Sequence, residues 1–253
     1  MNGISFRLSG KTACFRKPDV NQFAYFTYNN IHKVALLGLL GAILGYGGYT
    51  QLFDKNRGLK PKDKNYDNGY PEFYEKLQEF KVSIIPIAPH GYFSKKIQVF
   101  NNSVGYASRE EGGNLIVREQ WLENPSWQII VLNNGSSEYK KLKEYLIDKK
   151  SVFIPYLGKN DHPANIDNVM EIELNEKIEN IRLSSLFIEN SCEIYNGKPR
   201  GELSYIFREV SPIILQKEFH FYEYKNLIFT NHKVVSIEYK DIYSNDNKNY
   251  FFI

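Results

Sequence analysis

A glycine-rich apolar run between residues 31 and 49 constrains the fold more than any other part of the sequence. Its core, Val34 to Gly45, is the most apolar stretch of the chain and carries no charge. Spanning a membrane takes about 20 apolar residues, and this run is shorter and dense in glycine. Gly38, Gly41 and Gly45 recur at helical spacing, so one helix face lacks side chains and can pack closely against a sheet or a neighbouring subunit. We therefore expect a buried helix, with a membrane helix as the alternative.

Length and composition indicate an ordinary folded protein. The 253 residues suffice for one elaborated domain or two small ones, and 42% apolar with 24% charged residues is typical of soluble globular proteins. Charged residues interrupt every short apolar run near the N-terminus, so no signal peptide is expected. Cys14 and Cys192 lie far apart and fit no metal-ligand spacing, which favours a reducing compartment. We expect a cytoplasmic protein.

Positive charge concentrates near the N-terminus. The whole chain has a net charge of only +3. Residues 1–34 hold five basic groups against one acid, which leaves the other 219 residues with a net charge of −1. A basic face on an otherwise balanced body suits local contact with phosphates, although a solvated charged edge would give the same pattern.

The order of the expected elements is that of a ferredoxin-like fold. A strand–helix–strand unit precedes a second one, with a large excursion between the second and third strands. In the second unit Ser136 or Ser137 can cap the helix, and Tyr139, Leu142 and Leu146 share its apolar face. The expected elements are a strand at Ile4–Phe15 bent at Ser9-Gly10, a helix at Ile31–Tyr49, a strand at Val82–Ile87, a strand at Trp127–Leu132, the capped helix, and a strand at Val152–Tyr156.

The excursion predicts a projecting hairpin. Extended segments at Lys95–Phe100 and Asn114–Arg118 flank a polar stretch, so we expect a hairpin over about residues 91–118. Before it, residues 54–71 are polar and rich in turn-forming residues, which is typical of a surface loop, and a short helix is expected at Glu72–Phe80.

The C-terminal third has strand candidates and no good long helix. We therefore expect an α+β protein with two parts. Residues 1–165 would form the ferredoxin-like domain with its inserted hairpin, and residues 166–253 a small β-rich extension.

No catalytic motif stands out in the sequence. The five histidines are scattered, and there is no His-Glu-x-x-His spacing, phosphate loop or Gly-x-Ser-x-Gly motif. Metal-free RNA cleavage would need a base, an acid and a cation. Candidate sets are His32 and Lys33 with Tyr46 or Tyr49, and His90 with Lys95. A metal-independent endoribonuclease is therefore the alternative to a binding protein, and no metal or cofactor is expected.

The run from Phe153 to Ala164 is the most informative motif. A strand ends in Pro155-Tyr156, Gly158 turns the chain, and Lys159 lies on the loop before a second proline. These features indicate a rigid turn that presents Tyr156 and Lys159 for stacking and phosphate contact. A plain strand-ending turn would have the same residues.

The Pro-Tyr-Leu-Gly-Lys…Pro-Ala sequence of this turn resembles the signature turn of the fifth Cas protein family, the handle-binding subunit of type I Cascade complexes. Three further segments resemble that family in the same order. They are Phe6 to Pro18, similar to its opening strand; Lys33 to Gly48, similar to its first helix; and Arg118 to Trp127, similar to the segment that leaves its thumb hairpin. The resemblance covers about residues 4–165, and the type I-B branch fits best.

The resemblance implies a RAMP-superfamily fold and a non-catalytic role in antiviral defence. The family lies at the foot of the Cascade filament, where it grips the 5′ handle of CRISPR RNA (crRNA) and contacts the large subunit and the nearest backbone subunit. Target DNA would be met only indirectly. The family's thumb, here about residues 91–118, folds over the RNA. One branch cleaves precursor RNA with a tyrosine, a lysine and an adjacent histidine, but this sequence has no Lys-His pair.

Cations for the RNA backbone and aromatic rings for splayed bases would make the RNA contacts. We expect them in the opening strand, at the start of the first helix, on the thumb and in the turn. The residues are Lys11, Arg16, Lys17, His32, Lys33, Lys95, Lys96, Arg109, Arg118, Tyr156 and Lys159. No catalytic or metal-binding residue and no membrane contact are expected.

Overall fold

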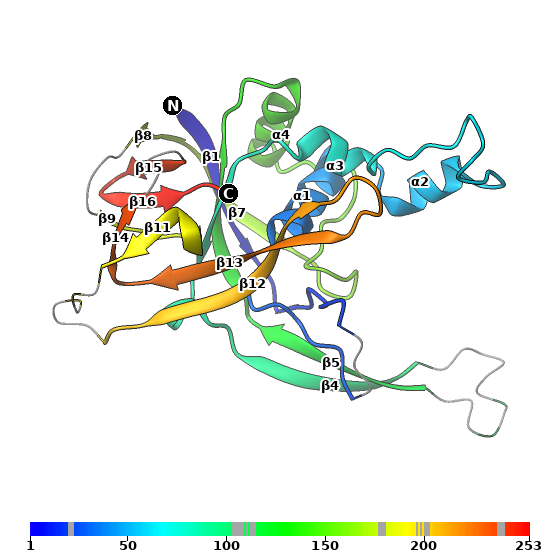
Figure 1. The fold of residues 1–253 in the computed structure, drawn as a ribbon, viewed down its shortest axis with the longest axis horizontal. Helices are drawn as coiled ribbons and strands as arrows, with labels where there is room; N and C mark the ends of the chain where they lie inside the picture. The colour runs from blue at the N-terminus through cyan, green and yellow to red at the C-terminus, as the bar shows by residue number, and fades with distance from the viewer. Residues whose placement is uncertain are drawn as a thin grey trace.

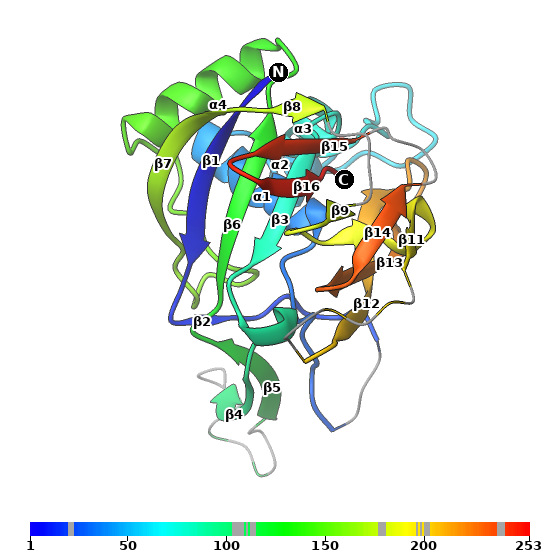
Figure 2. The same cartoon turned by 90° about the vertical axis from the view of Figure 1, so that its left-hand side faces the viewer.

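A four-stranded antiparallel sheet and two helices form the centre of the molecule (Figures 1 and 2). The computed structural model describes residues 1–19, 23–102, 109, 111, 115–176, 181–195, 197, 199, 203–236 and 241–253. The strand order is β3–β6–β1–β7, with α1 after β1 and α4 after β6, which is the expected ferredoxin-like plan in an α+β protein. These elements are β1 (Asn2–Ser9), α1 (Lys33–Leu44), β3 (Val82–Pro86), β6 (Ser126–Leu132), α4 (Ser137–Ile147) and β7 (Asn165–Glu173).

Both faces of the central sheet are covered. Alternate residues of a strand point to opposite faces. In β6, Ile129 and Val131 belong to the same buried cluster as the leucines of α1 and α4. Ile130 and Leu132 belong to a second cluster with Phe252 near the C-terminus. The helices therefore lie on one side of the sheet, and β15 (Ile242–Asn245) and β16 (Lys248–Phe251) lie on the other, as Figure 2 shows.

The fourth strand of the sheet is β7, so the strand predicted at Val152–Tyr156 is wrong. The N–H groups of Val152 and Phe153 donate to the carbonyls of Ile43 and Ala42, at distances of 3.0 and 3.1 Å. This segment satisfies the last carbonyls of α1 instead of pairing as the fourth strand. β7 pairs with β1 along its length and begins where the predicted domain boundary falls, and the division into two domains stays a prediction.

Helix α1 is buried as expected, but its glycine face packs against another helix and not against the sheet. A Cβ atom on Gly41 would lie 2.5 Å from the Cβ of Phe73, which belongs to α3 (Glu72–Leu77). The absent side chain at this position is what lets α3 approach so closely. Gly45, with φ of 85°, ends the helix in the left-handed conformation.

A short helix that the sequence analysis missed, α2 (Tyr49–Lys55), follows α1. The expected surface loop begins after it. Over the described part of the chain, no single helix has the length and apolar character needed to cross a membrane, although α1 and α2, bent by 71°, have them together.

The excursion is the expected hairpin, hereafter the thumb. Strands β4 (Lys95–Asn102) and β5 (Leu115–Glu123) pair antiparallel from Lys95↔Leu122 to Asn102↔Leu115. β2 (Thr12–Ala13), which follows the bend in the first strand, pairs with the base of β5. Residues 103–108, 110 and 112–114 of the predicted thumb lie outside the described residues.

The C-terminal part is rich in β-strands, as expected. Its longest element is a hairpin of β12 (Ile206–Leu215) and β13 (Tyr222–Thr230), which extends across the front of the molecule in Figure 1. Buried side chains of this hairpin belong to the same cluster as those of α1. The shorter elements are β8 (Asn175–Glu176), β9 (Ile181–Arg182), β10 (Phe187–Ile188), η3 (Glu189–Ser191), β11 (Cys192–Ile194), β14 (Lys233–Ser236), β15 (Ile242–Asn245) and β16 (Lys248–Phe251).

Candidate nucleic-acid interface

The thumb has two faces with different surroundings. Because side chains alternate along a strand, Lys95 and Lys96 point to opposite faces. Lys95 shares its face with Arg118, whose cross-strand partner is Val99. Lys96 shares the other face with Trp121, directly opposite it on β5. We call the first the open face and the second the turn face.

The segment after β2 runs alongside the thumb. Tyr25 N–H donates to the carbonyl of Arg118 (2.9 Å), and its own carbonyl accepts from Gln120 N–H (2.8 Å). A further bridge joins Arg16 to Thr27. These backbone contacts bring the basic residues of the opening strand to the thumb.

Four predicted cations gather here, each above an aromatic ring. The guanidinium carbon of Arg16 lies 3.4 Å from the ring centroid of Tyr25, and that of Arg118 lies 5.4 Å from that of Phe23. These distances lie within the range of cation–π attraction. The ammonium nitrogens of Lys17 and Lys95 lie 5.2 and 5.4 Å from the centroids of Tyr28 and Tyr92. We call these four cations and their four rings the cation–aromatic surface.

A half-buried carboxylate lies beside this surface. Glu209 of β12 accepts hydrogen bonds from the backbone N–H groups of Asn29 (2.6 Å) and Asn30 (3.1 Å). The Asn29 side chain bonds to Gly91 and Phe93 at the thumb base, with its amide donating to the Gly91 carbonyl and its oxygen accepting from Phe93 N–H. Burial raises the pKa of Glu209 against the opposing effect of these hydrogen bonds. The β12–β13 hairpin and the thumb base are thereby joined.

On the turn face, Lys159 forms an ion pair within the protein. Its ammonium group lies 2.9 and 2.8 Å from the two carboxylate oxygens of Glu119. Trp121 Nε1 also donates to Glu119, and the Trp121 ring packs edge-on against His162. The charge of Lys159 is thus matched by the carboxylate of Glu119, a residue that is only 4% exposed, and its predicted phosphate contact stays a prediction.

The turn itself is seated tightly against β2. Cys14 N–H donates to the carbonyl of Leu157 (3.1 Å), and Thr12 bonds to Nδ1 of His162 (2.7 Å). Gly158 has φ of 89°, and a Cβ there would lie 2.0 Å from the Cys14 carbonyl oxygen. The turn therefore anchors the thumb to the body, and Tyr156 remains half-exposed at its rim.

His32 and Lys33 lie outside this surface, and their predicted RNA contacts stay predictions. His32 is buried and caps α1, with Nδ1 accepting from Ala35 N–H (3.1 Å). Burial lowers the pKa of His32 to about 3, so the ring is neutral at pH 7. Lys33, whose pKa is lowered by burial, interacts with Glu79 and Asp241, away from the thumb.

The remaining predicted residues lie at the margins. Lys11 is exposed at the thumb base, where its carbonyl accepts from Asn124 N–H (2.9 Å). Lys96 lies 5.8 Å from the Trp121 ring centroid and 4.0 Å from Glu123 on the turn face. Arg109 is exposed on the thumb.

The histidines of the two candidate cleavage sets lie in different surroundings. His32 is enclosed by the rings of Phe15, Tyr28 and Tyr222. His90 is exposed and packs its ring against Tyr205 instead (4.7 Å between centroids). In the described ranges, no group of three or more His, Cys, Asp or Glu side chains is placed to hold a metal ion.

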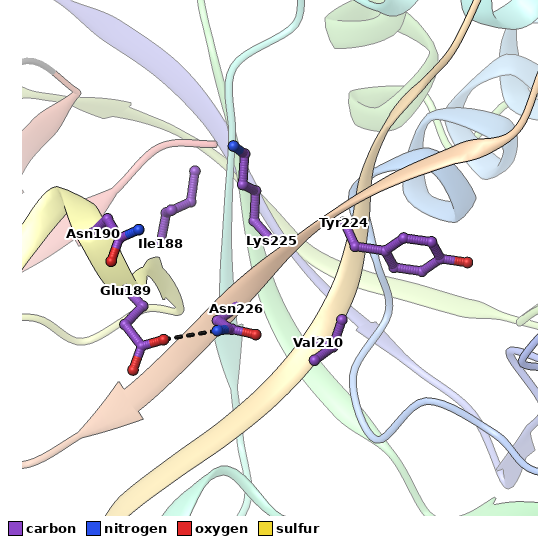
Figure 3. A pocket seen from close by; sticks show the side chains of 7 residues that line it. All are labelled: Ile188, Glu189, Asn190, Val210, Tyr224, Lys225 and Asn226. Carbon is purple, nitrogen blue, oxygen red and sulfur yellow. Dashed lines mark hydrogen bonds between the residues drawn. The ribbon is translucent and has the colours of Figure 1, made fainter.

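A cavity of about 230 Å³ lies on the β12–β13 hairpin beside η3 (Figure 3). Glu189 accepts a hydrogen bond from Asn226 there (2.8 Å), and its charge is matched by Arg208. None of the predicted RNA-binding residues lines this cavity, whose lining is Ile188, Glu189, Asn190, Val210, Tyr224, Lys225 and Asn226.

Sequence analysis missed the aromatic half of the surface. Phe23, Tyr25 and Tyr28 fall in a short aromatic-rich run directly after the basic opening strand, and this proximity was the available signal. Tyr92 follows the η1 turn (Pro89–Gly91) at the thumb base and had no comparable signal.

No protein-family model and no curated protein matches the sequence. Among solved structures, one described as a CRISPR RNA-guided surveillance complex contains a chain similar over 93% of this chain and 91% of its own, with 12% identity and a TM-score of 0.52. A CRISPR protein from Archaeoglobus fulgidus is similar over 99% and 98%, with 14% identity and a TM-score of 0.49. A chain of a type III-B Cmr-beta complex is similar over 92% and 86%, with 11% identity and a TM-score of 0.43. These structural neighbours are CRISPR-associated proteins, and the first similarity shows a shared fold.

Proposed function

We propose that this protein is a non-catalytic, cytoplasmic subunit of a type I CRISPR surveillance complex that holds the 5′ handle of crRNA. The observation that carries the proposal is the cation–aromatic surface at the thumb. Its cations would pair with phosphates, and its exposed rings, Phe23 and Tyr92, would stack on unpaired bases. The combination of charge and exposed rings favours a single strand over a duplex, whose bases are already stacked.

The resemblance to the fifth Cas protein family supports the finer part of the proposal. The type I-B-like character, the contacts with the large subunit and the backbone subunit, and the indirect relation to target DNA rest on that resemblance. The fold shared with a chain of an RNA-guided surveillance complex agrees with it.

A binding role is favoured over RNA cleavage by the state of His32. A general base must reach the proton it removes and must hold a suitable pKa. His32 is buried, and its Nδ1 already accepts the capping hydrogen bond of α1. Of the two candidate cleavage sets, this leaves the one with His90, which has the Tyr205 ring as its neighbour.

The test is to co-express the tagged chain with its neighbouring genes and a CRISPR array, and to sequence the RNA that co-purifies. We expect short, uniform RNAs with a repeat-derived 5′ end. A variant in which Arg16, Lys17, Lys95 and Arg118 become Glu should lose this RNA. The matched control reverses four lysines on or just after α4, at the far end of the molecule from the thumb (Figure 1): Lys140, Lys143, Lys149 and Lys150.

The outcomes separate the alternatives. Equal loss of RNA in both variants would mean that overall charge, not the thumb, sets the affinity. Absence of guide RNA from the wild-type preparation would contradict the proposed function. Cleavage of repeat RNA by the purified chain alone would establish the ribonuclease.

A further inference from the structure

A second basic and aromatic surface lies away from the thumb. Helix α2 and the tip of the β12–β13 hairpin meet at the upper right of Figure 1, whereas the thumb lies at the bottom of both views. The ring of His220, at the hairpin tip, lies 5.7 Å from that of Tyr49 on α2 and 5.5 Å from that of Tyr70. The helix and the hairpin therefore form one continuous surface.

This surface exposes large aromatic side chains. Phe53, Phe219 and Phe221 are between 62% and 68% exposed, and Tyr49 is 48% exposed. Phe219 and Phe221 stack on each other, with centroids 5.7 Å apart and planes 29° apart. Phe53 lies one helical turn beyond Tyr49 and so on the same side of α2. Exposed apolar groups gathered in this way mark an interaction site.

The loop after α2 has a defined conformation. The side chain of Asn56 donates to the carbonyl of Asp67 (2.9 Å) and accepts from its N–H (2.8 Å). Lys55 pairs with the Asp67 carboxylate (2.6 Å). These contacts join the two ends of the loop formed by residues 57–66, hereafter the clasped loop, which lies at the surface.

The clasped loop is strongly basic. Residues 57–66 hold four basic side chains and one acid, a net charge of +3 that equals the charge of the entire chain. The acid, Asp63, accepts from the backbone N–H of Lys60 (2.8 Å). Lys60, Lys62 and Lys64 are exposed, and within the described ranges no carboxylate lies within 4 Å of their ammonium groups. Their charge is available for an external anion.

We propose that this arm surface, formed by α2, residues 57–66 and the β12–β13 tip, binds a second single-stranded nucleic acid segment. The three lysines would contact phosphates, and the exposed rings of Phe53, Phe219 and Phe221 would stack on bases. An acidic protein partner would use the lysines but has no bases to stack on three phenylalanine rings. Unpaired nucleotides match both features. The surface is separate from the thumb and takes no part in the proposed handle binding.

The test uses a fluorescent dT20 oligonucleotide, with anisotropy measured at several salt concentrations. The reference protein is the full chain with Arg16, Lys17, Lys95 and Arg118 changed to Glu, so that the thumb does not hold the probe, and the arm changes are added to it. A Lys60→Glu, Lys62→Glu, Lys64→Glu variant should bind at least about tenfold more weakly, and its log–log salt slope should fall by about 2. A Phe53→Ala, Phe219→Ala variant should also lose about tenfold, without a change in slope. The α4 control changes, added to the same reference protein, should leave its binding unchanged.

Three results would overturn the proposal. The first is an arm variant that binds dT20 as the reference protein does. The second is a pair of results that would together exclude stacking: a duplex binds as tightly as dT20, and the phenylalanine variant binds dT20 with unchanged affinity. The third is capture of an acidic peptide such as oligoglutamate in place of dT20. Guide RNA co-purification is scored separately, with the arm changes made in the otherwise wild-type chain, which should retain it, so failure here is distinguishable from failure of the handle-binding function.

Discussion

The ammonium group of Lys159 sits between both carboxylate oxygens of Glu119, 2.9 and 2.8 Å away, and so ties the 155–163 turn to the thumb. The two residues are 40 positions apart in sequence, and the Glu119 side chain is only 5% exposed. Backbone bonds from Tyr25 to Arg118 and from Gln120 to Tyr25 flank Glu119 on the same strand. The pair therefore holds the part of β5 on which the cation–aromatic surface is built.

Replacing Lys159 by Met should lower the free energy of unfolding by about 1–3 kcal/mol at pH 7, since it leaves a buried carboxylate with fewer partners. Urea denaturation followed by circular dichroism measures this. The control is Lys150→Met, which removes the exposed pair with Asp148 and should leave the free energy of unfolding nearly unchanged.

The pH dependence of the same variant has a defined sign. Burial acts to raise the pKa of Glu119, but the hydrogen bonds from Lys159 and Trp121 outweigh it and hold the pKa below 4.5. The pair therefore stabilises the fold above pH 4.5, and this contribution is lost as the pH falls through the folded-state pKa. The stability difference between wild type and the Met variant should shrink below pH 4.5. A difference that stays constant to pH 3 would contradict the ion pair.

Replacing Gly158 by Ala should destabilise the protein by at least about 2 kcal/mol. The left-handed backbone alone costs a residue with a Cβ about 1–2 kcal/mol. In addition, the new Cβ would lie 2.0 Å from the carbonyl oxygen of Cys14, so the turn must move off β2. Gly58→Ala is a matched control, because Gly58 has φ of 81° but nothing within 4 Å of its Cβ position. Equal losses in thermal denaturation would show that the contact with Cys14 contributes nothing.

Local patterns in the sequence predicted the elements whose stability is local. Helix α4 is capped by Ser136, whose hydroxyl accepts from Tyr139 N–H, and it buries Tyr139, Leu142 and Leu146 as its periodicity indicates. The strand prediction for Val152–Tyr156 was wrong because the apolar composition of this segment suits a strand, whereas the N–H groups of Val152 and Phe153 bond to the end of α1. That choice depends on a helix more than 100 residues earlier, which no local window contains.

The candidate site divides in the same way. Arg16, Lys17, Lys95 and Arg118 were predicted as cations and do come together. However, whether a lysine side chain lies in solvent or pairs with a buried carboxylate depends on the tertiary structure. Lys159 has a charged partner from a distant strand, and the sequence alone gave no sign of that contact.

Gly41 and Gly38, on the same helix, should respond oppositely to alanine. At Gly41 the new Cβ would lie 2.5 Å from the Cβ of Phe73, so overpacking should cost about 1–3 kcal/mol. At Gly38 the nearest atom is 3.7 Å away, an ordinary contact. There alanine should stabilise the helix by about 0.5–1 kcal/mol. Guanidinium denaturation of both variants measures the difference. Loss of stability at both positions would mean that α3 lies closer to the whole glycine face than these distances indicate.

His32 should make the fold sensitive to mild acid. Burial holds its folded-state pKa at about 3, against about 6.5 in the unfolded chain. Because burial lowers the folded-state pKa of this base, the neutral ring contributes fully to the stability of the fold above pH 6.5. As the pH falls from 6.5 toward 3, the unfolded chain binds a proton that the folded chain does not, and this contribution to stability is lost. Between pH 7.5 and 5.5 the loss from this one group should be about 1.4 kcal/mol.

His32→Asn isolates this effect, since asparagine can also accept the capping hydrogen bond of α1 but does not titrate. Other groups titrate equally in both proteins, so the difference between the two stability–pH curves reports His32 alone. Wild type should lose about 1.4 kcal/mol more than the variant over the stated interval, as measured by urea denaturation at each pH. Parallel curves would mean that the imidazole is protonated as readily in the folded chain as in water. In that case His32 would be open to solvent, and the argument against its acting as a general base would fail.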